Sequence, residues 1–90
     1  MVEQYQKSII VEAIQFESTD KDHIDEIIDF VDLPISVDYT SEGVRLRVIR
    51  GAYDVAVAYL TDYLFKDAGG RISVMKQADF EAEYEPVGSG

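Results

Sequence analysis

The sequence predicts an α+β domain, in which one amphipathic helix at about 20–32 packs on a twisted, mainly antiparallel sheet of about five to six strands, followed by a short C-terminal helical turn. Apolar residues recur with the period of a helix in one segment, and with the period of a strand in several later segments that turn residues separate. A chain of 90 residues, 47% of them hydrophobic, can bury one modest core, so we expect a single domain over residues 1–87. Residues 88–90, Gly-Ser-Gly, are typical of a flexible tail or a remnant of cloning.

The first predicted elements are a strand at 8–16 and the helix that follows it. Both alternating faces of the strand carry apolar residues, so we expect a central strand that is covered on both sides for part of its length. The helix begins after a run of good N-cap residues and carries an apolar stripe of two turns, which consists of Ile24, Ile27, Ile28 and Val31. Pro34 ends the helix, because its ring and its missing N–H are incompatible with a helix interior.

The period of the apolar pattern changes to two after the helix. Alternating segments between turn residues predict strands at 35–39, 44–50, 53–60, 63–66 and 71–75. One face of the 53–60 strand carries the small side chains of Ala56 and Ala58, which would let another layer approach closely. The segment 77–84 is typical of a short helix or turn, in which Phe80 and Tyr84 are four residues apart and cover an edge of the core.

Charge is distributed unevenly along the chain. The formal net charge is −10, from 18 acidic and 8 basic side chains. Residues 17–32 hold seven acids against Lys21, residues 79–85 hold four acids, and residues 44–76 hold six Lys and Arg against three Asp. One interpretation is that these segments pair within the molecule or between subunits, and the other is that the arginines of the middle segment face an anionic ligand.

Composition argues against several classes of function. The absence of cysteine excludes disulfides, thiolate nucleophiles and cysteine zinc sites, and the net charge argues against general binding of nucleic acid or anionic lipid. No apolar run approaches the roughly 18 residues of a membrane span. His23, the only imidazole, lies in the first turn of the helix, where we expect a solvated side chain. The carboxylates of Asp20, Asp22 and Glu26 lack the central glycine of a calcium loop. We therefore expect no catalytic residue, no metal and no cofactor.

Two sets of residues are candidates for binding. The first could hold a nucleotide-like anion, since arginine forks match phosphates and tyrosine rings stack on bases, and it consists of Arg45, Arg47, Arg71, Tyr53 and Tyr59. Alternatively, these arginines pair with Asp38, Asp54 or the acidic helix, while the tyrosines cover the core or a subunit contact. The second set is the polar face of the helix, which is solvated or faces a basic partner, and it consists of Asp22, Asp25, Glu26 and Asp29.

Two segments of the chain carry motifs that go beyond secondary structure. Residues 5–16 begin with a tyrosine and end in Val-Glu-Ala-Ile-Gln-Phe. Residues 62–86 hold an Asp-Tyr pair, a hairpin that closes through glycine, and a terminal Phe and Tyr-Glu, at positions Asp62, Tyr63, Lys66, Gly70, Phe80, Tyr84 and Glu85. In this order the two segments resemble a family of small, mostly uncharacterised bacteriophage and prophage proteins. Thr61 departs from that pattern where glycine is common, and Arg71 departs where an acid is common.

The resemblance implies a phage origin and an α+β domain, and it brings no established catalytic residue. On physical grounds, Asp62 is well placed to accept backbone N–H bonds in a turn. We therefore expect a non-enzymatic phage accessory protein that acts by binding in the cytoplasm of the bacterial host, as a small homo-oligomer. It would antagonise a host protein or a defence pathway by capturing a basic partner or a nucleotide-like signal. The alternatives are a minor virion or morphogenesis component and an acidic DNA mimic.

Overall fold

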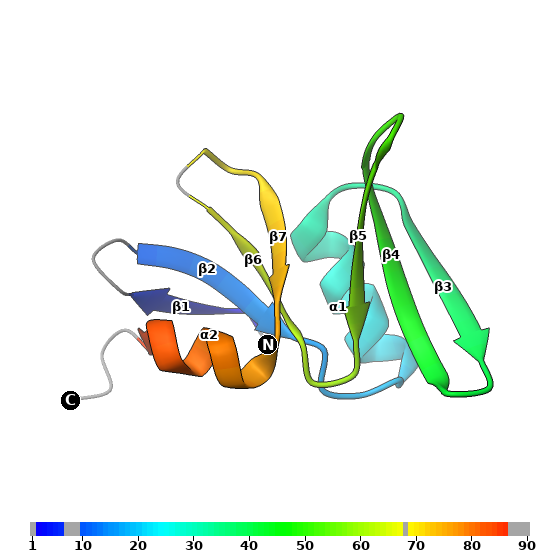
Figure 1. Ribbon diagram of the computed structural model, residues 1–90, viewed down its shortest axis with the longest axis horizontal. Helices are drawn as coiled ribbons and strands as arrows, with labels where there is room; N and C mark the ends of the chain where they lie inside the picture. Colours follow the sequence, from blue (N-terminus) through cyan, green and yellow to red (C-terminus); the bar gives the residue numbers. More distant parts are fainter. Residues whose placement is uncertain (1, 7–9, 68, 87–90) are drawn as a thin grey trace.

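The computed structural model describes residues 2–6, 10–67 and 69–86, and these form an α+β fold of two helices and two antiparallel sheets (Figure 1). The helices are α1 (Lys21–Val31) and α2 (Gln77–Glu83). The five-stranded sheet has the order β7-β6-β2-β1-β8, and its strands are β1 (Glu3–Gln6), β2 (Ile10–Gln15), β6 (Tyr63–Lys66), β7 (Ile72–Met75) and β8 (Glu85–Pro86). The three-stranded sheet is β3 (Ile35–Thr40), β4 (Gly43–Gly51) and β5 (Asp54–Tyr59). The predicted fold class is confirmed.

Helix α1 begins and ends within one residue of the predicted bounds. Asp32 ends it in the left-handed conformation, with φ 55°, and its backbone N–H donates to the carbonyl of Ile28 at 3.0 Å. The buried face of α1 is turned slightly from the predicted one, because Phe30 is buried while Ile28 remains 37% exposed. Its residues pack against the inner face of the three-stranded sheet, so α1 lies behind that sheet in Figure 1.

The main core lies between α1 and the two sheets. Leu46, Val48 and Ala58 of the three-stranded sheet are fully buried there, and Ala56 packs against the same cluster. The small side chains of β5 therefore do what their pattern predicts and let the helix layer approach closely. The five-stranded sheet contributes Ile14 to this core, together with Leu64 and Ile72.

Strand β2 is central and is buried on both faces for part of its length, as predicted, while Glu12 remains exposed. Its other face, with Val11 and Ala13, belongs to a second apolar cluster beneath α2. Phe80 of α2 is fully buried in that cluster, with its ring stacked 4.2 Å from the ring of Tyr63 and 4.7 Å from that of Tyr84. The aromatic residues of the C-terminal segment thus cover the far side of the five-stranded sheet.

The strands divide between two sheets rather than forming the single sheet that the sequence predicts. The division occurs at Thr61 and Asp62, where Thr61 adopts φ 81° and the chain leaves β5. The Thr61 N–H donates to the carbonyl of Phe16 at 2.7 Å, and the Phe16 N–H donates to the carbonyl of Asp62 at 2.8 Å. These bonds direct β6 to pair with β2, with Phe65 opposite Ala13, instead of continuing the meander beside β5.

Two predicted features lie outside the described residues, and one observed strand was not predicted. The predicted tail at 88–90 and the first residues of the predicted strand at 8–16 lie outside them. Strand β1 was not predicted, because its sequence, Glu-Gln-Tyr-Gln, has no apolar alternation. Neither helix in the described part of the chain has the length and hydropathy needed to cross a bilayer.

Candidate partner-binding surfaces

An acidic groove runs along α1 and has a volume of about 1030 Å³. Its polar lining comes from the helix and from the segment before it, and consists of Glu17, Ser18, Asp20, Lys21, Asp22, His23, Asp25, Glu26 and Asp29, with Val2 and Phe30 as apolar contributions. The groove therefore contains all four residues of the predicted acidic face. Six carboxylates and one lysine line it, so it carries most of the negative charge of the helix segment.

The carboxylates of the acidic groove are only partly neutralised. Lys21 Nζ lies 2.8 Å from a carboxylate oxygen of Asp25, and this pair is exposed. Among the described residues, no cationic group lies within ion-pair distance of the carboxylates of Asp20, Asp22 or Asp29. The acids are also spread out, since no three potential ligands in the described part of the chain are placed to hold a metal ion. The groove thus offers a row of separate negative charges.

His23 forms part of the groove wall and is not the solvated side chain that the sequence predicts. Only 12% of its side chain is exposed. Its Nε2 atom lies 3.0 Å from the backbone nitrogen of Glu17, which donates to it, and 2.9 Å from the carbonyl oxygen of Gln15. The chain before α1 folds back over the first turn of the helix and covers the ring. The sequence around His23 contains no local signal of this cover.

Arg45 and Arg47 share one carboxylate on the outer face of the three-stranded sheet, the face opposite α1. Arg47 Nε lies 2.6 Å and Arg45 Nε 3.2 Å from Oδ2 of Asp38, and the Ser36 hydroxyl donates to Oδ1 at 3.0 Å. The hydrogen bond from Ser36, followed by those from the two arginines, lowers the pKa of the Asp38 carboxyl. Both arginines are therefore engaged with Asp38, which was one of the two alternatives.

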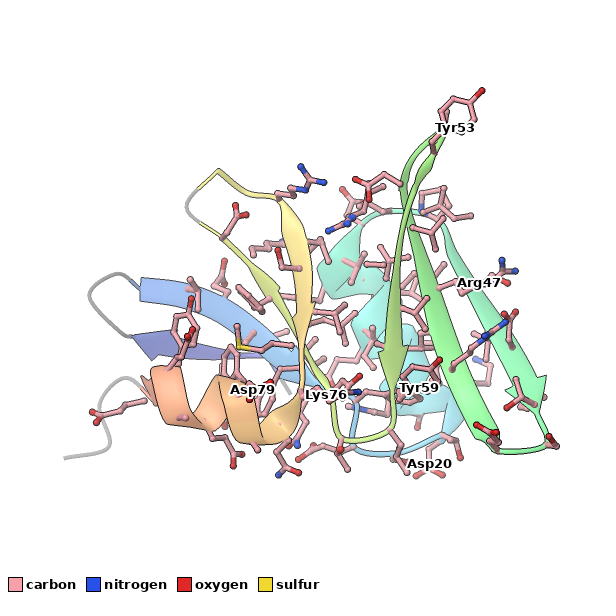
Figure 2. The ribbon with its side chains drawn as sticks, in the orientation of Figure 1. Asp20, Arg47, Tyr53, Tyr59, Lys76 and Asp79 are labelled. Carbon is pink, nitrogen blue, oxygen red and sulfur yellow. The ribbon has the colours of Figure 1, made fainter. Side chains whose placement is uncertain are left out.

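The two predicted tyrosines occupy different positions. Tyr59 lies opposite Arg45 on the outer face. The hydrogen bond of Arg45 to Asp38, and next its hydrogen bond to the Tyr59 side chain, raises the pKa of the Arg45 guanidinium. Lys76 Nζ lies 5.4 Å from the centre of the Tyr59 ring, a distance at which the ammonium and the ring attract each other (Figure 2). Tyr53 lies at the tip of the β4–β5 hairpin and is fully exposed, away from Arg47 (Figure 2).

Arg71 belongs to a different surface from Arg45 and Arg47. Its Nη2 donates to Oδ2 of Asp54 at 2.6 Å, and Oδ1 of the same carboxylate accepts from Arg50 at 2.6 Å. Arg50 lies on the opposite face of β4 from Arg45 and Arg47, where it lines a cleft of about 650 Å³ together with Arg71. The structure therefore does not bring the three predicted arginines together.

Comparison of the chain with protein-family models, with curated proteins and with solved structures found no match.

Proposed function

We propose that this chain is a binding protein, without catalytic activity, that captures a basic polypeptide segment in the acidic groove of α1. The observation that carries the proposal is the groove lined by six carboxylates, of which those of Asp20, Asp22 and Asp29 have no cationic partner among the described residues, while Asp25 contacts Lys21 and Glu26 contacts His23. Opposed charge of this kind steers a partner and selects it against acidic competitors. An anionic ligand is less well supported, because Arg45 and Arg47 are already bound to Asp38.

The spacing of the carboxylates favours an extended partner segment. Residues four apart on a helix are separated by about 6 Å along its axis, which is the separation of Asp22 from Glu26. Alternate residues of an extended chain are separated by about 6.6 Å. A segment with lysine or arginine at every second position would thus place one cation near Asp22 and the next beside Glu26, which also lies 3.4 Å from His23 Nδ1. Asp29 lies only about 4.5 Å further along the helix axis.

The apolar contributions to the groove support the same ligand chemistry. Val2 is a partly exposed apolar residue of the groove lining, whereas Phe30 is buried and has Lys66 Nζ 4.7 Å from the centre of its ring. Lysine and arginine side chains consist of an aliphatic stem and a charged head, so the stem can pack on apolar surface while the head binds a carboxylate. The resemblance to phage proteins supports placing such capture in an infected bacterium, where the partner would be a basic host protein that the phage antagonises.

Fluorescence anisotropy with a labelled heptapeptide, Lys-Ser-Lys-Ser-Lys-Ser-Lys, tests the proposal at 50 mM NaCl. The variant Asp22→Asn/Asp29→Asn removes two groove charges, and we expect it to bind about tenfold more weakly, because each lost pair is worth about 0.5–1 kcal/mol. The matched control Glu42→Gln/Asp79→Asn also changes the net charge from −10 to −8, but its residues are exposed and lie outside the groove.

The control variant should bind the peptide within about twofold of the unmodified chain. At this salt concentration the Debye length is about 14 Å, so charges outside the groove attract the peptide only weakly. Equal weakening in the two variants would show that overall charge attracts the peptide and would overturn the groove as the site. The absence of any binding by the unmodified chain would overturn the proposed function itself.

A further inference from the structure

The outer face of the three-stranded sheet carries an apolar stripe that is about half exposed, and Lys76 Nζ, 5.4 Å from the centre of the Tyr59 ring, contacts one end of it. The alternate residues of β4 and β5 that point away from α1 are partly exposed: Ile49 by 42%, Val55 by 46% and Tyr59 by 47%. Val57 lies between Val55 and Tyr59 on the same face, and Tyr53 extends the row at the hairpin tip. We refer to Ile49, Tyr53, Val55, Val57 and Tyr59 as the apolar stripe. Valine and isoleucine on an exposed sheet face are typical of surfaces that a partner buries.

The charges beside the apolar stripe indicate what kind of partner fits. The side chains on the outer face include one acid, Asp38, which Arg45 and Arg47 both contact, so this face has a local charge of +1. The whole chain has a net charge of −10, and α1 with its acidic groove lies on the other side of the sheet. Two copies that approach through this face therefore keep their acidic helices apart, whereas an approach through α1 would oppose like charges.

We propose that two copies of this chain associate through the outer faces of their three-stranded sheets, with the apolar stripe of one copy packed on that of the other. Sheets pack face to face at about 10 Å with their apolar side chains interdigitated, and the valines and tyrosines of the stripe are suited to this. Arg45 and Arg47 lie on the central strand β4, directly opposite Tyr59 and Val57 of the stripe, and both keep Asp38 of β3 as their partner. The acidic groove stays open in both copies, so the association is independent of the proposed function.

The size of the face indicates a weak association rather than a permanent one. Three strands about 4.8 Å apart, the longest of nine residues, present a flat area of about 400 Å². A stable dimer of standard size buries about 800 Å² on each partner. A face below standard size is typical of a weak, reversible association, for which we expect a Kd on the order of 10–100 µM.

Sedimentation velocity between about 2 and 300 µM, a range that spans this expected Kd, tests the proposal. The unmodified chain should change from monomer to dimer across this range, and Val55→Asp should remain a monomer, since it places an unpaired charge inside the contact. The matched control is Tyr39→Asp, because Tyr39 is 82% exposed, lies outside the apolar stripe and gives the same net charge of −11. Circular dichroism melting shows whether each variant is folded. A folded, monomeric Val55→Asp beside a dimeric Tyr39→Asp supports the proposal.

The salt dependence supplies a second measurement that does not rely on substitutions. Association of two chains of net −10 through apolar surface should strengthen when NaCl rises from 50 to 300 mM, because salt screens the repulsion between them. Binding of a basic peptide in the acidic groove should weaken over the same range, so the two processes are distinguishable. A chain that stays monomeric at the highest concentration at both salt levels overturns the proposal, as does a Val55→Asp variant that dimerises like the unmodified chain.

Discussion

Thr61 has a backbone conformation that disfavours its own side chain. Its φ of 81° lies in the region that glycine enters freely and that β-branched residues avoid. The side chain is exposed, whereas the backbone N–H donates to the carbonyl of Phe16 at 2.7 Å. Glycine would adopt the same φ without this strain.

Replacing Thr61 with glycine should stabilise the protein. Relief of a positive φ at a non-glycine residue is worth about 1–3 kcal/mol, and the added freedom of glycine in the unfolded chain offsets about 1 kcal/mol of this. We expect Thr61→Gly to raise the free energy of unfolding by about 1 kcal/mol, or the melting temperature by about 4–8 °C. Thermal and urea unfolding measure it. Thr61→Ala keeps the strain and should change little, and a destabilised Thr61→Gly would contradict the argument.

At the scale of elements, one arginine joins the two sheets where their edge strands β5 and β7 meet. Arg50 Nη1 donates to the carbonyl oxygen of Ile72 in β7 at 2.9 Å, while Nη2 donates to Asp54 in β5 at 2.6 Å. Asp54 in turn binds Arg71 at 2.6 Å. The guanidinium therefore caps a carbonyl that no neighbouring strand pairs with, and it holds the two sheets at a fixed separation.

Removal of this link should destabilise the protein more than removal of an exposed ion pair. The Arg50 side chain is 21% exposed, so Arg50→Ala loses hydrogen bonds in a partly dry setting and should lower the free energy of unfolding by about 2 kcal/mol. Arg50→Lys should recover only part of this, since one ammonium cannot reproduce the fork. Arg47→Ala, at a 44% exposed side chain, is the control and should have little effect in the same urea titration. Equal midpoints for Arg50→Ala and Arg47→Ala would contradict this role.

The elements that could be predicted are those whose signals are local. The periodicity of α1 and the turn residues between β3, β4 and β5 are properties of short segments, and these elements lie where they were expected. The division into two sheets depends on the hydrogen bonds of Phe16 to Thr61 and Asp62. Phe16 and Thr61 are 45 residues apart in the sequence. No short segment contains that information.

The candidate site shows the same limit. The acids of α1 were predicted to share a face, because helical spacing alone places them there. The groove also needs Val2 and Glu17, and its wall includes His23 under the backbone of the preceding segment. Among the arginines, spacing placed Arg45 and Arg47 on one face of β4, but their pairing with Asp38 depends on the register of β3, in which Asp38 lies opposite Arg45.

At the scale of the whole molecule, the acids along α1 and the Arg45–Arg47 pair lie on opposite sides of the three-stranded sheet. The acidic groove occupies the α1 side, and the outer face of the three-stranded sheet has a local excess of positive charge. Within α1, Asp22, Glu26 and Asp29 repel one another at helical spacings of three and four residues. This repulsion opposes folding while it attracts a cationic partner, so the surface proposed for binding is also a source of instability.

Salt should therefore stabilise the isolated protein. Raising NaCl from 20 to 300 mM screens the repulsion in the acidic groove, and we expect the melting temperature to rise by several degrees. The variant Asp22→Asn/Asp29→Asn should melt higher at 20 mM NaCl and respond less to added salt. Differential scanning calorimetry at both concentrations measures this. A melting temperature that falls with added NaCl would mean that attractive ion pairs outweigh the repulsion.

The pairing pattern of the two sheets also orders the steps of folding. In the three-stranded sheet, Tyr39 lies opposite Val44, so the chain closes a loop of only a few residues. In the five-stranded sheet, Glu12 lies opposite Lys66, and 54 residues separate them. The longer loop costs about 2 kcal/mol more in chain entropy before any contact forms. The meander that carries the apolar stripe can therefore exist while β2 still lacks its partner, and an unfinished chain exposes that stripe before the rest of the molecule is in place.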